Sequence, residues 1–101
     1  MRFENFWLNL TKILTTKNDF ETLKQEKVFI AKFSTDKVIV SPTSTQFERK
    51  IDKNQFLTVW NFAKKLPKYE QFKRGNYNKI TRNGSYILAL IKYILKDGEI
   101  D

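Results

Sequence analysis

The chain has 101 residues and a mass of 12.1 kDa, which allows one hydrophobic core and therefore a single small basic domain spanning residues 1–101. Hydrophobic residues make up 41% of it and aromatic residues 15%, which excludes a disordered chain. The net charge is +8, and the absence of Cys and His excludes disulfides, thiol nucleophiles, ordinary zinc sites and His-based catalytic triads.

The sequence contains no targeting or membrane signal. No run approaches 18 apolar residues, and the first residues, MRFENFWLNLTK, lack both the apolar core and the cleavage site of a signal peptide. We therefore expect a cytoplasmic protein that uses no membrane, metal or cofactor. Fifteen of the cations are Lys and four are Arg, a bias that an AT-rich genome produces without functional cause. Part of the basic charge thus has an alternative interpretation as solvated Lys side chains.

The first predicted element is an amphipathic helix. Apolar residues recur at helical spacing and line one face: Phe3, Phe6, Trp7, Leu10, Ile13 and Leu14. The Asn18-Asp19 pair predicts a turn, after which Phe20 and Leu23 are expected to pack a short irregular segment against the core. Trp7 and Trp60 both occupy apolar helical positions, which predicts core packing.

Three strands are predicted next. Residues 27–33 and 38–41 are rich in Val, Ile and Phe, and the polar residues 34–37 between them predict a hairpin loop. Residues 46–51 alternate and predict a third antiparallel strand, which completes a meander. Arg49 falls on the apolar side of that strand, so it is expected to extend past the core, pair with an acid or face a groove.

Two helices are predicted to complete the chain. Asp52 and Gln55 have capping-box spacing and predict a helix from Lys53 that Pro67 ends. Ser85 is expected to cap a very apolar helix over residues 86–96, with Gly98 beyond its end and a frayed tail over residues 97–101. The predicted fold class is α+β: an N-terminal helix, a three-stranded antiparallel meander, and two C-terminal helices packed on one face of the sheet.

Positive charge concentrates in one segment. Residues 64–82 contain seven Lys or Arg and one acid, interleaved with aromatic residues and Asn. Cations neutralise phosphates, aromatic faces stack on unpaired bases, and Asn amides suit base edges. The sequence therefore predicts a nucleic-acid-binding segment over residues 64–85. Its candidate contact residues are Lys64, Lys65, Lys68, Tyr69, Lys73, Arg74, Asn76, Tyr77, Lys79, Arg82, Asn83 and Ser85.

The end of this segment is the best local candidate for a phosphate contact. Residues 81–85 lead directly into the last predicted helix, whose first N–H groups and dipole attract anions. Arg82 is expected to clamp a phosphate there, with hydroxyl groups from Thr81 and Ser85 beside it. The sequence leaves open whether the ligand is DNA or RNA, and single- or double-stranded.

Two other function classes remain open at this stage. The apolar helix 86–96 would suit a small protein-binding module, inhibitor or subunit that forms a homodimer or docks on a larger protein. A ribonuclease without His or Cys is a minor alternative, in which the residues stabilising charge would be Arg74, Tyr77, Lys79 and Arg82. No other catalytic residue is predicted.

Overall fold

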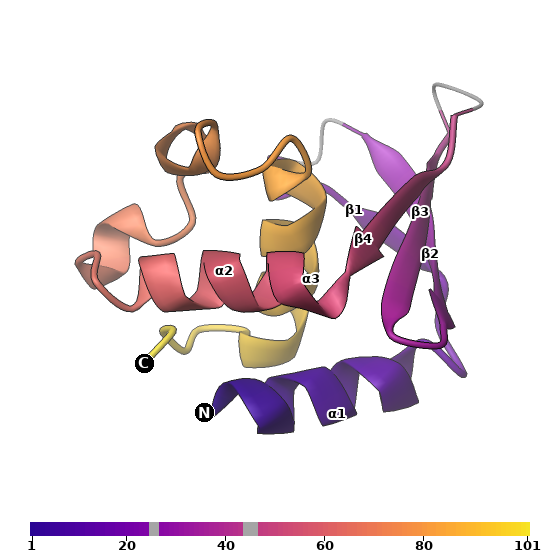
Figure 1. Ribbon diagram of the computed structural model, residues 1–101, viewed down its shortest axis with the longest axis horizontal. Helices are drawn as coiled ribbons and strands as arrows, with labels where there is room; N and C mark the ends of the chain where they lie inside the picture. Colours follow the sequence, from indigo (N-terminus) through magenta and orange to yellow (C-terminus); the bar gives the residue numbers. More distant parts are fainter. Residues whose placement is uncertain (25–26, 44–46) are drawn as a thin grey trace.

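The structure, a computed structural model, describes residues 1–24, 27–43 and 47–101 (Figure 1). Helices and strands form one mixed α+β fold, as predicted. In chain order, the elements are α1 (Phe3–Ile13), β1 (Asp19–Glu21), β2 (Val28–Ser34), β3 (Lys37–Pro42), β4 (Arg49–Asp52), α2 (Lys53–Ala63), the short 3₁₀ helices η1 (Lys68–Glu70) and η2 (Arg74–Tyr77), and α3 (Gly84–Leu95).

The sheet has four antiparallel strands in the order β1-β2-β3-β4, so the prediction of three strands was wrong by one. The missed strand is β1, where Phe20 pairs with Phe29 of β2. A three-residue strand with one apolar residue carries no periodic signal. It forms because the edge of β2 offers backbone partners, such as the Ala31 N–H that donates to Asn18 O at 2.7 Å.

α2 and α3 lie to one side of the sheet, and α1 runs beneath them to the near end of the sheet, where Trp7 meets Phe33 of β2 at 5.9 Å (Figure 1). The central position of α3 explains its composition, since Ile87, Leu88, Leu90 and Ile91 are fully buried. Tyr86 of α3 meets Phe29 of β2 edge to face, with ring centroids 5.1 Å apart. Of the helices in the described ranges, none combines the length and apolarity needed to cross a bilayer.

An aromatic cluster joins α1 to α2. The Phe6 ring stacks on Trp60 at 5.1 Å, and Trp7 meets Phe56 edge to face at 5.2 Å. Both tryptophans are buried, which confirms that they belong to the core. Glu4 of α1 also pairs with Lys53 of α2 at 3.3 Å. These contacts hold α1 on the side of α2 away from the basic segment.

The helix ends follow the sequence only in part. Asp52 accepts a hydrogen bond from the Gln55 N–H at 2.9 Å, which confirms the predicted cap of α2. By contrast, α3 begins at Gly84, so Ser85 lies inside its first turn and does not cap it. At the other end Lys96, with φ 58°, closes the helix, and Gly98 lies beyond it as predicted, its N–H donating to Leu95 O at 2.9 Å.

The tail over residues 97–101 is not frayed, which corrects the prediction. Ile100 is only 1% exposed, and its backbone is held by the buried side chain of Gln71. Gln71 donates from Nε2 to Ile100 O at 2.7 Å and accepts from Ile100 N–H at 2.9 Å. The same amide donates to Ala63 O at 3.0 Å, so one side chain joins the end of α2 to the tail. The polar composition of residues 97–101 gave no indication of this long-range contact.

Candidate nucleic-acid interface

The basic segment runs along one side of the molecule. Residues 64–83 leave the end of α2, pass through η1 and η2, and return to the start of α3, on the side of α2 and α3 opposite α1 (Figure 1). Its cations share this side but fall into two groups at the two ends of the segment.

The first group surrounds the end of α2. All its members are exposed: Lys64, Lys65, Lys68 and Tyr69. Lys64 follows the last turn of α2, and Lys68 with Tyr69 belongs to η1. Among the carboxylates of the described residues, Glu70 is the only one that forms an ion pair with a cation of residues 64–82, and its partner is Lys73 at 3.2 Å. The positive charge of this segment therefore stays largely available to an external anion.

Lys73 and Asn76 both serve local structure around Glu70. Asn76 Nδ2 donates to Glu70 O at 2.9 Å and to Glu70 Oε2 at 3.2 Å. The hydrogen bond from Asn76, followed by that from Lys73, lowers the pKa of the Glu70 carboxyl below its ordinary value. These two hydrogen bonds give the amide nitrogen of Asn76 a structural role at η2, and the contact of this exposed side chain with a base edge stays a prediction.

Tyr77 is part of the core, which corrects its assignment as a contact residue. Its side chain is fully buried, its ring meets Phe62 edge to face at 5.5 Å, and its hydroxyl donates to Gln71 O. Tyr77 and the exposed Tyr69 both lie among polar and basic residues, so the sequence did not show that one is buried and the other is not. The ribonuclease alternative loses one of its four proposed residues for the same reason.

Burial of Tyr77 predicts a loss of stability at alkaline pH. Burial raises the pKa of its phenol from 10.0 to about 12. Below pH 10 both the folded and the unfolded chain keep the proton. Between the two pKa values the unfolded chain releases it first, so the free energy of unfolding falls as pH rises. At pH 11 this single group should remove about 1 kcal/mol of stability.

Urea denaturation at pH 9 and pH 11 checks this expectation on the parent chain and on Tyr77→Phe. The variant lacks the titrating group, so it should lose about 1 kcal/mol less than the parent between the two pH values. Equal losses of unfolding free energy in the parent and the variant would show that Tyr77 is not the group responsible.

The second group of cations gathers at the start of α3 and contains three of the four arginines. Arg82 lies two residues before Gly84, the first residue of the helix. Arg74 packs beside that residue, since a β-carbon added at Gly84 would lie 3.9 Å from Arg74 Cγ. Arg49 arrives from β4, and its Nη1 donates to Asn83 Oδ1 at 3.2 Å. We refer to Arg49, Arg74 and Arg82 as the arginine cluster.

A hydrogen-bond network fixes the loop that carries Arg82. Gln55 Oε1 accepts from Thr81 Oγ1 at 3.0 Å and from Asn83 Nδ2 at 3.1 Å. The Asn83 N–H in turn donates to Thr81 Oγ1 at 3.0 Å. Both ends of the Asn83 amide are thus occupied, so Asn83 positions Arg49 and is not available as a base reader. The capping pattern predicted the backbone role of Gln55 but not this use of its side chain.

This loop borders an open polar groove of about 420 Å³. The lining residues come from the loop before α3 and the first turn of α2: Gln55, Asn78, Lys79, Ile80, Thr81, Arg82 and Asn83. Lys79 and Arg82 are exposed at its surface, and Ser85 lies half-buried one turn away. Cations beside amide and hydroxyl groups, at the positive end of the α3 dipole, suit an anionic ligand.

Arg49 and Gln55 also belong to this surface, although neither is among the contact residues predicted from the sequence. Arg49 gave a signal, because a cation on the inward side of a strand needs a partner beyond the core. Its guanidinium lies 5.4 Å from the ring centroid of Tyr86, so it extends across α3 to reach Asn83. Gln55 gave no signal beyond its capping position, because its partners lie 26 and 28 residues away in the chain.

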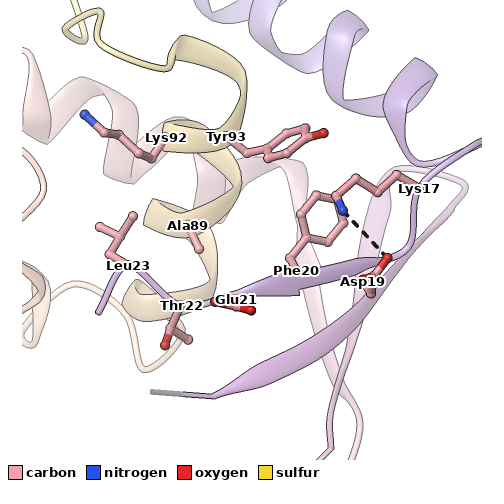
Figure 2. A pocket seen from close by; sticks show the side chains of 9 residues that line it. All are labelled: Lys17, Asp19, Phe20, Glu21, Thr22, Leu23, Ala89, Lys92 and Tyr93. Atoms are coloured by element: carbon pink, nitrogen blue, oxygen red, sulfur yellow. Dashed lines mark ion pairs between the residues drawn. The ribbon is translucent and has the colours of Figure 1, made fainter. Parts of the chain in front are cut away.

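A second hollow, of about 350 Å³, lies between β1 and α3 (Figure 2). Its charges are mixed: Lys17 pairs with Asp19 at 3.7 Å and also lies 5.2 Å from the Phe20 ring centroid. Lys92 lines the hollow, yet its Nζ lies 4.8 Å from the ring centroid of Phe72. None of the predicted contact residues lines this hollow, and its balanced charge does not favour a polyanion.

The protein-binding alternative depended on an exposed face of the last helix. Residues 86–91 are all buried, and Tyr93 is the large apolar side chain of α3 that is exposed. The hydrophobicity of α3 is therefore accounted for by the chain's own core. That burial accounts for residues 86–91, whereas Tyr93 is exposed and Ile94 and Leu95 are half-buried, so docking or dimerisation through residues 86–96 stays a prediction.

Comparison with known proteins gives no independent guide to function. No protein-family model, no curated protein and no solved structure matches this chain. What can be inferred about function therefore comes from the chain's own side chains.

Proposed function

We propose that this protein binds nucleic acid through the arginine cluster and the groove beside it. The observation that supports the proposal is that Arg49 of β4 bonds to Asn83 just before α3, where Arg74 packs beside Gly84 and Arg82 lines the groove. Arg is the cation best suited to phosphate because its planar fork donates two parallel hydrogen bonds.

The surrounding charge supports a polymeric anion over a small one. Lys79 extends the cluster along the groove, and the lysines at the end of α2 continue the same segment. Repeating phosphates can engage both groups at once, and each contact releases counterions. An isolated phosphate or nucleotide would use only the groove.

A salt-dependent titration tests this proposal. A labelled oligonucleotide should bind with an affinity that falls about tenfold or more between 50 mM and 200 mM salt, because several phosphate contacts are lost together. Inorganic phosphate at the same ionic strength serves as the competitor and should displace the oligonucleotide only weakly. Absence of binding at 50 mM salt would refute the proposal.

A further inference from the structure

Two aromatic side chains stand out among the described residues because they are almost fully exposed. Phe47 is 81% exposed and Tyr69 is 74% exposed. Single exposed apolar residues are common on protein surfaces and need no ligand to explain them. The positions of these two rings indicate a ligand, because they lie at opposite ends of the proposed nucleic-acid surface.

Phe47 lies close in the chain to the arginine cluster. It precedes Arg49, the first residue of β4, by two residues. Arg49 then bonds to Asn83 at 3.2 Å, which places it beside Arg82. The first ring therefore lies two residues along the chain from a member of the arginine cluster.

Tyr69 lies at the other end of the proposed surface and is connected to the start of α3 through Lys73 and Arg74. Lys73 Nζ lies 5.8 Å from the Tyr69 ring centroid. Lys73 is followed by Arg74, whose Cγ packs at the first residue of α3. The start of β4 and the orange turn of η2 lie on the side of α2 and α3 away from α1 (Figure 1). Each exposed ring thus has a cation near it, Lys73 beside Tyr69 and Arg49 two residues after Phe47, within a molecule 34 Å in its longest dimension.

We infer that the ligand is a single-stranded nucleic acid, whose backbone follows the cations while unpaired bases stack on Phe47 and Tyr69. This inference rests on the proposed function and names its substrate class. A duplex keeps its bases stacked inside the helix, so exposed rings gain nothing from it. A single strand offers base faces to both rings. The buried α3 also lacks an exposed face of the kind that enters a major groove.

Binding of matched probes tests the inference. The probes are a fluorescent oligo-dT of about 12 nucleotides, an oligo-U of the same length, and a dA·dT duplex of the same length. The parent chain should bind the single strands more tightly than the duplex. Phe47→Ala and Tyr69→Ala should each lower single-strand affinity about tenfold and change duplex affinity by less than about twofold. Phe47→Trp and Tyr69→Trp should retain single-strand binding because they keep a stacking face.

Leu8→Ala is the matched control. Leu8 is also an exposed large apolar residue, but it lies on α1, and its loss should leave affinity for every probe unchanged. Tighter binding of the duplex, or wild-type single-strand affinity in both alanine variants, would overturn the inference while the proposed function stands. Absence of binding to all three probes at low salt would overturn both.

Discussion

Replacing Arg49, Arg74 and Arg82 together with Gln is expected to weaken oligonucleotide binding by roughly one to two orders of magnitude near 0.1 M salt. Each arginine accounts for one phosphate contact and the release of its counterion. For a single strand, loss of three contacts should reduce the slope of log affinity against log salt by about 2. Titrations at several salt concentrations measure both quantities.

A charge-matched control separates a defined site from diffuse attraction. Replacing Lys12, Lys24 and Lys27 with Gln removes the same charge from exposed positions outside the cluster. Those residues lie on α1 or between β1 and β2, so the control should lose less than about threefold in affinity. Equal losses in the two triple variants would mean that the many lysines attract polyanions without a site, which is the alternative that the composition left open.

Replacing Gln71 with Leu is expected to lower the free energy of unfolding by about 3 kcal/mol, a large share of the stability of a domain of this size. Leu fills a similar volume but leaves the carbonyl and the N–H of Ile100 without their partner, whereas the Ala63 carbonyl keeps its hydrogen bond from the Leu66 N–H at 2.9 Å. Each buried backbone group left unpaired costs about 1–3 kcal/mol. Urea denaturation at neutral pH provides the measurement.

A double-mutant cycle identifies the source of that loss. Deleting residues 99–101 removes two of the four hydrogen bonds of the Gln71 side-chain amide, so Gln71→Leu should cost about 1–2 kcal/mol less in the deleted chain than in the full chain. If the substitution costs the same in both chains, Gln71 does not act by holding the tail.

The elements predicted correctly are those with local signals. The helix near residues 3–14 repeats apolar residues every three or four positions, and the cap of α2 needs only Asp52 and the Gln55 N–H three residues later. The β2–β3 hairpin pairs Ser34 with Lys37 across the predicted loop. In each case the partners are close in the chain, so the pattern of residue types contains the information.

The errors occur where a tertiary contact, and not the local pattern of residue types, decides the structure. β1 exists through pairing with β2, and Ile100 is ordered through Gln71, 29 residues away. The same holds for Tyr77 and Tyr69, which have similar sequence surroundings. Tyr77 is drawn inward by Phe62 and by the Gln71 carbonyl, whereas Tyr69 remains exposed.

By itself, the sequence determined the class of this protein: a small α+β domain whose excess positive charge lies between its last two helices. Composition and periodicity suffice to assign this class, because the charge and the spacing of apolar residues can be read directly from the order of residues. Only the tertiary structure decided which cations meet. Arg49 reaches the start of α3 because β4 pairs with β3 and Asn83 is held by Gln55, and no local pattern records contacts made across such separations.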